Sequence, residues 1–274
     1  MVEHIGGQAV IEGVMMRSPT KVAVSVRLQN GKIKTKKEKF KKINKYSKMP
    51  LIRGSFVLVD TLVKGMKALI WSADQQLGKD EKITTKEIVF SLLIAFGFGI
   101  ILFLVVPLYL AGFVSAKGTI LYNVVDGILR VIALVAYMAV ISLMKDIKVV
   151  FQYHGAEHKA VNCYEAGKKL TLANAKKFTT IHKRCGTSFL FIVVIISIII
   201  FSFILSPKFY INLLVRIILL PVVAGISYEI LKLGEKTKII RWATWPGQWL
   251  QKITTKEPTN KQIEVAITSL KSVL

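Results

Sequence analysis

The chain has 274 residues, 53% of them hydrophobic, and its 39 Lys and Arg residues against 16 Asp and Glu residues give a formal net charge of +23. Soluble globular domains are rarely so apolar, and strong basicity in an apolar chain is typical of a membrane protein whose charged segments stay in the cytoplasm. A basic excess also suits a nucleic-acid-binding protein, but the apolar segments explain the composition better, so nucleic acid is not an expected partner.

Residues 1–87 are expected to form a cytoplasmic region that contains a β-hairpin and an amphipathic helix. Apolar and polar residues alternate over residues 22–29 and are followed by Asn30-Gly31, a pair typical of a two-residue hairpin turn. The basic run at residues 34–48 is either a solvated strand and loop or a contact with anionic lipid headgroups. Apolar residues at spacings of three and four predict an amphipathic helix over residues 52–76, on the membrane surface or packed under the bundle.

Four segments are long and apolar enough for transmembrane helices, which need about 20 apolar residues. Short connections separate the first segment from the second and the third from the fourth, so each pair is expected to form an antiparallel hairpin. The predicted fold is therefore mainly α-helical, a polytopic membrane protein with four transmembrane helices. These helices are residues 88–114, 120–144, 187–205 and 210–231.

Lysine and arginine residues are distributed unequally on the two sides of these helices. The three long segments outside the spans contain 35 of the 39, whereas the two short connections contain one each, Lys117 and Lys208. The positive-inside rule then places both termini and the central loop in the cytoplasm. The expected division is a basic N-terminal region (1–87), a first transmembrane pair (88–144), a cytoplasmic helical hairpin (145–186), a second pair (187–231) and a cytoplasmic helical tail (232–274).

The loop at residues 145–186 contains the side chains best suited to chemistry, because it holds three of the four histidines and both cysteines of the chain. His154, Glu157 and His158 match the H-x-x-E-H spacing of inverted zincins. On a helix the two histidines share a face and reach one metal ion, and Glu157 lies beside them as a candidate general base. Two surface histidines on a helix would give the same pattern, so the motif alone does not decide.

This loop is expected to fold as a helical hairpin beside the membrane. A first helix over residues 146–166 ends at Gly167, and Thr171 caps a second helix that continues to about Lys183. The chain then returns to the membrane for the third span, which brings the two arms of the hairpin side by side.

Counting outward from the turn of this hairpin at about 1.5 Å per residue places His158 level with His182 and His154 level with Cys185. Imidazole and thiolate are good ligands for a divalent metal, and we expect zinc. Four protein ligands would make a closed, structural site, whereas three would leave an open position of the catalytic kind. Alternatively, His182 is a solvent-facing side chain and Cys185 a small buried thiol.

Two carboxylates are candidates for a further metal ligand. Glu165 follows His158 by seven residues, and Glu229 lies near the inner end of the fourth span, where a carboxylate needs a partner. A metal at that depth would supply the partner, so Glu229 joins the predicted metal ligands. In the alternative, Glu229 reaches the interface and pairs with Lys232.

Three further charged residues, Asp126, Arg130 and Arg216, fall within the spans. We expect them to form an internal charge group that locks the bundle; the other reading is a polar pathway for a substrate or ion.

Four motifs of the chain resemble the YqhQ-like family. They are GGQAVIEGVMMR at residues 6–17, YHGAEHK at residues 153–159, RCGTS at residues 184–188 and GISYE at residues 225–229. This is a bacterial membrane-protein family of unknown function that is commonly labelled a predicted metal-dependent enzyme. The resemblance covers nearly the full chain. It implies a location in the bacterial cytoplasmic membrane and a metal site, but no substrate.

Three hypotheses for function follow from the residues. The first is a metal-dependent membrane enzyme, in which His154, His158, His182 and Cys185 bind the ion and Glu157 promotes hydrolysis of a peptide or lipid-like bond. The second is a non-catalytic assembly protein with a structural metal, whose surfaces bind lipid headgroups or another membrane protein. The third is a transporter, which the lack of an evident inverted repeat disfavours.

Overall fold

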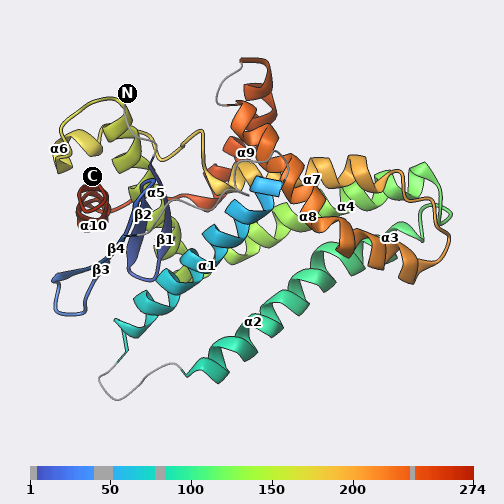
Figure 1. Cartoon of the computed structure of the whole chain (residues 1–274), viewed down its shortest axis with the longest axis horizontal. Coiled ribbons are helices and arrows are strands. Elements are labelled where there is room, and N and C mark those ends of the chain that lie inside the picture. Colours follow the sequence, from blue (N-terminus) through green and yellow to red (C-terminus); the bar gives the residue numbers. More distant parts are fainter. Residues whose placement is uncertain (1–4, 40–51, 78–83, 235–237) are drawn as a thin grey trace.

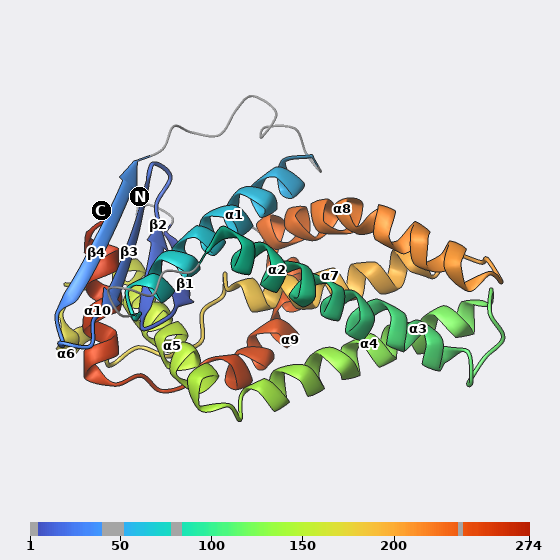
Figure 2. The same ribbon diagram turned by 90° about the horizontal axis from the view of Figure 1, so that it is seen from below.

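The structure is a computed structural model that describes residues 5–39, 52–77, 84–234 and 238–274. It is mainly helical, with a small antiparallel sheet toward one end of the long axis and apolar helices running toward the other (Figures 1 and 2). The strands are β1 (Gly6–Val10), β2 (Gly13–Arg17), β3 (Lys21–Arg27) and β4 (Ile33–Lys39). The helices are α1 (Ile52–Asp74), α2 (Thr85–Ile100), the π-helical turn η2 (Ile101–Val105), α3 (Val106–Ala111), α4 (Ile120–Ile141), α5 (Lys145–Glu165), α6 (Leu172–Ala175), α7 (Gly186–Phe201), α8 (Phe209–Gly234), α9 (Lys238–Thr254) and α10 (Asn260–Lys271).

The N-terminal sheet is larger than the single predicted hairpin, because it has four strands in the order β1-β2-β3-β4. The predicted turn lies between β3 and β4, where Gly31 has a φ of 80°. The ladder pairs Arg27 with Ile33, so this turn is longer than the two residues expected. Residues 6–17, which gave no clear secondary-structure signal, form the β1–β2 hairpin. The basic run at residues 34–48 starts in β4, and from residue 40 it lies outside the described residues.

Helices cover both faces of the sheet. Val14, Met16 and Ala23 face α5 and α10, whereas Met15 and Val24 face Ala68, Leu69 and Trp71 of α1. This alternation follows from the two-residue period of a strand, whose successive side chains point to opposite faces. The sheet therefore serves as a central layer that holds α1 on one side and α5 on the other.

Among the described residues, three helical segments rather than four are long and apolar enough to cross a membrane: Thr85–Ala111, Ile120–Ile141 and Phe209–Leu233. The third expected span forms a shorter apolar helix, Gly186–Phe201. Its 16 residues extend about 24 Å, less than the roughly 30 Å of a bilayer core. The helix ends at Phe201, and the chain turns at Ser202, five residues before Pro207.

The first of these segments stands apart from the others. Helix α2 has no buried residue, and Figure 1 shows it diverging from the remaining apolar helices. The segment first meets α4 near the π-helical turn, where the rings of Phe98 and Phe103 lie against Tyr137. It continues along α4 where Leu108 and Ala111 of α3 pack against Tyr122. Most of the apolar surface of α2 is therefore exposed.

The charged residues inside the bundle form one buried group, as predicted. Asp126 of α4 lies 3.0 Å from Arg130 on the same helix and also pairs with Arg216 of α8. Asn123 accepts a second hydrogen bond from Arg216 at 2.6 Å. Phe201 of α7 covers both guanidinium groups, with its ring centroid 5.0 and 5.3 Å from their central carbons. This group therefore connects three helices by direct contacts.

The predicted helical hairpin is only half helical. Its first arm is α5, in agreement with the expected helix, but its second arm contains only the short helix α6. After α6 the chain runs without regular helix to Cys185 because side chains of neighbouring helices satisfy its backbone. Asn162 donates to the carbonyl groups of Thr179 and Ile181 at 3.0 and 3.1 Å. Gln251 of α9 holds the N–H and carbonyl groups of His182, each at 2.9 Å.

Candidate metal centre

Two histidines of α5 and a cysteine meet at the N-terminal end of α7. His154 and His158 lie one turn apart on α5, and Cys185 is the residue that caps α7. One ligand atom from each lies within 4.8 Å of the other two, and Nε2 of His154 is 3.2 Å from Sγ of Cys185. The three side chains therefore form a group whose spacing suits a single metal ion.

The orientation of both imidazole rings is fixed by backbone carbonyl groups. Nδ1 of His154 lies 2.9 Å from the carbonyl oxygen of Thr254, and Nδ1 of His158 contacts that of Thr180. A carbonyl oxygen only accepts, so each Nδ1 carries the hydrogen and each Nε2 keeps its lone pair for the site. Second contacts of this kind commonly fix metal-binding histidines.

The group fits a divalent ion in donor chemistry and in size. Bonds of about 2.0–2.3 Å to a shared tetrahedral ion place nitrogen and sulfur atoms roughly 3.3–3.8 Å apart. Burial lowers the pKa of His158, with a further effect from His154, so the imidazole is neutral as a ligand must be. Burial raises the pKa of the Cys185 thiol to about 12, so deprotonation of this side chain requires a cation beside it.

Glu157 lies at the edge of this group. One oxygen of its carboxylate is 3.8 Å from Nε2 of His158 and 4.0 Å from Nε2 of His154. The side chain is buried, and burial raises its pKa, partly offset by His154 and His182. A buried carboxyl group whose pKa moves toward neutrality is typical of a general acid or base.

His182 lies beside the three ligand atoms but has a different partner. Its ring centroid is 5.6 Å from that of His158, so the two arms meet at the level that counting predicted. Its Nε2 lies 3.3 Å from Oε2 of Glu165, whose other oxygen pairs with Arg184. Glu165 therefore contacts both His182 and Arg184. His182 lies next to the group of His154, His158 and Cys185, but its Nε2 faces Glu165.

Glu229 is placed differently from its predicted role as a metal ligand. Its carboxylate forms an ion pair with Arg53 of α1, with Arg53 Nε 2.6 Å from Oε1. This contact joins α1 to α8, where Gly54 also lies against Gly225 and Tyr228. The partner of this carboxylate is therefore an arginine from the N-terminal region, and neither a metal ligand group nor Lys232 was needed to explain it.

An open pocket of about 600 Å³ gives access to the candidate centre. Its walls come from α1, α5 and the start of α7, and residues 5–9 of the β1 region also line it. Gly7 lies directly against Glu157, because a Cβ atom at Gly7 would come within 2.9 Å of Cγ of Glu157 and 2.7 Å of the carbonyl oxygen of Met15. Gly7, the second glycine of the first motif, thus allows the strand to approach the carboxylate.

Helix α9 supplies contacts that were missed in the sequence. Gly247, Gln251 and Thr254 lie at spacings of four and three, which places them along one side of the helix. Gly247 lets α9 touch Ser188 of α7, since an added Cβ would be 2.4 Å from the Cα of Ser188. Gln251 holds His182, and Thr254 orients His154. The available signal was a stripe of small and polar residues at helical spacing within a tryptophan-rich amphipathic helix.

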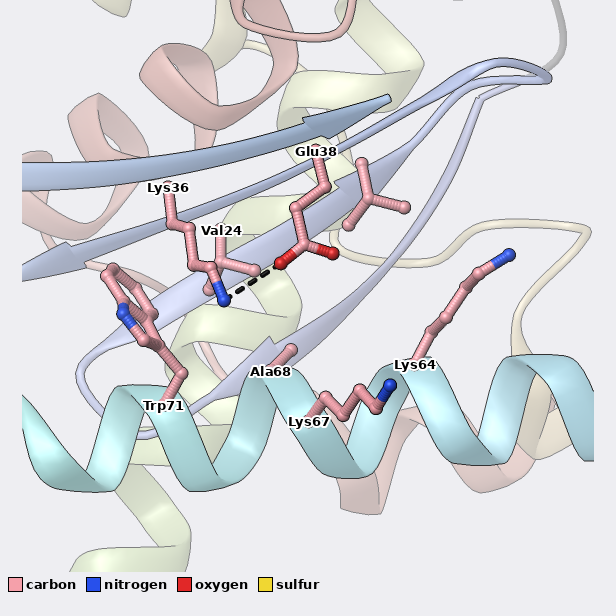
Figure 3. A pocket seen from close by; sticks show the side chains of 8 residues that line it. Val24, Lys36, Glu38, Lys64, Lys67, Ala68 and Trp71 are labelled. Carbon is pink, nitrogen blue, oxygen red and sulfur yellow. Dashed lines mark ion pairs between the residues drawn. The ribbon is translucent and has the colours of Figure 1, made fainter. Parts of the chain in front are cut away.

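A second, smaller pocket of about 60 Å³ lies between the sheet and α1 (Figure 3). Lys36 and Glu38 of β4 form an ion pair of 2.8 Å across it, and Lys64, Lys67 and Trp71 come from α1. Its lining residues include no histidine or cysteine. This pocket is a basic surface feature, chemically distinct from the candidate metal centre.

Comparison with known proteins places this arrangement in a family. The chain is 32% identical over 291 aligned residues to the uncharacterized protein YqhQ of Bacillus subtilis (strain 168), and the alignment covers 98% of this chain and 92% of the relative. No solved structure matches it. Residues 49–274 match the family model described as a protein of unknown function, DUF1385. This chain therefore belongs to the DUF1385 family.

Proposed function

We propose that this protein is a metal-dependent hydrolase that acts at the cytoplasmic surface of the bacterial cytoplasmic membrane. The observation that carries the proposal is the convergence of His154, His158 and Cys185 beside the buried Glu157 in an open pocket. Structural zinc sites are closed by four protein ligands, whereas catalytic sites use three and keep one position open. Three ligands at the wall of a pocket fit the catalytic kind.

A divalent ion in this group, for which zinc is the best match to nitrogen and sulfur donors, supplies a Lewis acid for a substrate carbonyl. The chain supplies the other requirements. The carbonyl groups of Thr254 and Thr180 hold the two imidazoles in the binding orientation. Glu157 takes a proton from the attacking water and delivers it to the leaving group, a role suited to its raised pKa.

The location at the membrane surface is supported by the way in which the site is built. Cys185 directly precedes the apolar helix α7, and α5 begins a few residues after the end of α4. The many basic residues outside the apolar helices support a cytoplasmic location for this side. The same charge distribution favours anionic lipid headgroups as neighbours of the sheet and α1.

The test uses the purified full chain in lipid nanodiscs loaded with zinc, with fluorescence-quenched casein and p-nitrophenyl butyrate as probes of peptide and ester hydrolysis. Glu157→Gln should lower hydrolysis at least 100-fold with its zinc content unchanged. The matched control is Glu264→Gln, since Glu264 is an exposed partner of Arg27 far along the chain from the site. If neither probe is hydrolysed by the wild type, or if both variants behave alike, the metal group is a structural element and the enzyme assignment fails.

A further inference from the structure

The floor of the pocket beside the candidate metal centre includes an edge of the sheet. Among the residues that the structure describes, strand β1 pairs with β2 and with no other strand, because the strand order is β1-β2-β3-β4. Residues 5–9, which contain most of this strand, line the same pocket as His154 and Glu157. An edge strand presents backbone donors and acceptors that another extended chain can use.

The hydrogen-bonding pattern shows which residues of β1 face outward. In an antiparallel pair of strands, every second residue directs its backbone groups to the same neighbour. The carbonyl group of Glu12 accepts a hydrogen bond from the N–H of Arg27 at 2.8 Å, so the even-numbered residues of β2 direct their backbone groups to β3. By this alternation Gly13 and Met15 direct their backbone groups to β1, where their partners are Val10 and Gln8. The residues between these partners, Gly7 and Ala9, therefore direct their N–H and carbonyl groups away from the sheet.

The next residue whose backbone faces outward, Ile11, has a hydrogen-bond partner on α1. The N–H of Ile11 donates to Oγ of Ser72 on α1 at 3.1 Å. Within the described residues, the backbone groups of Gly7 and Ala9 have no hydrogen bond of this kind. The edge is thus closed by α1 at the hairpin turn and open where it lines the pocket.

The surroundings of the open edge suit a chain in extended conformation. Thr61 of α1, Phe151 of α5 and Leu190 of α7 line the same pocket, and the last two add apolar surface. Among the described atoms, none lies within 4 Å of the position of an added Cβ at Gly6, so the face of the strand is open there. A peptide paired with β1 would continue past Gly7, whose Cα lies against Glu157.

We propose that the substrate is a polypeptide segment of another protein, which binds in extended conformation as an added strand beside Gly7 and Ala9 and presents its backbone to the candidate metal centre. Binding stands on the geometry of the edge, whereas cleavage rests on the proposed hydrolase function. In that reaction the oxygen of water bonds to the peptide carbonyl carbon and the C–N bond breaks. Glu157 transfers the proton of the water to the leaving nitrogen, and the products are a carboxylate and an amine.

The experiment measures binding without turnover, in the full chain carrying Glu157→Gln in lipid nanodiscs. The probe is fluorescein-labelled α-lactalbumin, reduced and carboxymethylated so that it stays unfolded, and the readout is fluorescence anisotropy. Adding Ala9→Pro removes one outward N–H without removing a bond to β2, and a proline is tolerated on an edge strand. The matched control, Ala9→Ser, keeps this N–H.

We expect Ala9→Pro to weaken binding of the probe at least tenfold and Ala9→Ser to change it less than twofold. Native α-lactalbumin, whose chain is not extended, should bind at least tenfold more weakly than the unfolded probe. Equal affinity of the proline and serine variants, or no binding of the unfolded probe, would overturn the proposal.

A second measurement guards against misfolding of the proline variant. Amide hydrogen exchange of residues 5–11 in the Glu157→Gln protein should slow on addition of the unfolded probe, and unchanged exchange there contradicts strand addition. The same binding assay with His154→Ala separates the two ideas. Retained binding without zinc or hydrolysis supports the strand-addition site even where the hydrolase assignment fails.

Discussion

Nε2 of His154 lies 3.2 Å from Sγ of Cys185, although the two residues are 31 positions apart and belong to different helices. The positions of both atoms are fixed by their surroundings. The carbonyl group of Thr254 orients the imidazole, and Cys185 directly precedes α7. The contact joins α5, the start of the apolar helix α7 and, through Thr254, the C-terminal end of α9. Metal binding and the packing of these three helices are therefore expected to depend on each other.

The two adjacent glycines of the first motif should respond differently to substitution. Gly7→Ala forces a Cβ into contact with Glu157 and with the backbone of Met15, so we expect a loss of about 1–3 kcal/mol in stability and a large loss of hydrolysis. Gly6→Ala is the matched control, because nothing lies within 4 Å of its added Cβ. Thermal unfolding and the casein assay measure both effects, and equal behaviour of the two variants would contradict the close contact with Glu157.

The Gln251 side chain is expected to hold the segment that carries His182. Gln251→Ala leaves the backbone N–H and carbonyl groups of His182 without their partners, which should cost about 1–3 kcal/mol. Zinc affinity should fall as well, because the segment also carries Thr180 and leads to Cys185. The exposed neighbour Lys252 provides the control Lys252→Ala. Zinc titration with a competing chelator compares the variants; an unchanged affinity in Gln251→Ala would show that this clamp is dispensable.

The buried charge group should be essential to the bundle. Asp126→Asn leaves Arg130 and Arg216 without a carboxylate partner, and loss of one member of a buried ion pair costs about 3–5 kcal/mol. Asp146→Asn, at an exposed position in the first turn of α5, is the control and should be nearly neutral. Melting temperatures in nanodiscs test this, and a polar pathway without a structural role predicts instead that both variants are equally stable.

The pH dependence of the metal-free protein should reveal the environment of Glu157. Burial raises the pKa of this carboxyl group above its ordinary value of 4.5, so the folded state retains a proton that the unfolded state has lost. The stabilising effect is fully present below pH 4.5 and is lost as the pH rises through the raised pKa. Relative to Glu157→Gln, the metal-free wild type should therefore become less stable as the pH rises above about 4.5. Parallel melting curves across this range would contradict the buried carboxyl group.

Patterns of local origin were readable from the sequence. The helix over residues 146–166 and the amphipathic helix over residues 52–76 depend on the spacing of neighbouring residues, so local patterns were sufficient to predict them. The meeting of His154 with Cys185 was also expected, but the count assumed a helical second arm, which the structure does not have. The four-stranded sheet was underestimated because its first hairpin, residues 6–17, alternates poorly and is defined by packing on both faces.

The remaining differences arise from contacts between distant segments. The second arm of the hairpin is not helical because Asn162 and Gln251 satisfy its backbone, which no local propensity reports. Glu229 meets Arg53, a residue 176 positions away, so its partner was not visible from the residues around it. The role of Gly7 likewise depends on the approach of β1 to α5, which only the folded chain shows.

The central claim is that His154, His158 and Cys185 bind one metal ion, and metal content measures it most directly. Elemental analysis of the full chain, purified without chelators, should give about one divalent ion per chain, with most of it lost in Cys185→Ser and in His154→Ala. Cys163→Ser, which changes the other buried cysteine, should keep the ion. An equal metal content in all four proteins, or none in the wild type after incubation with zinc, would contradict the account.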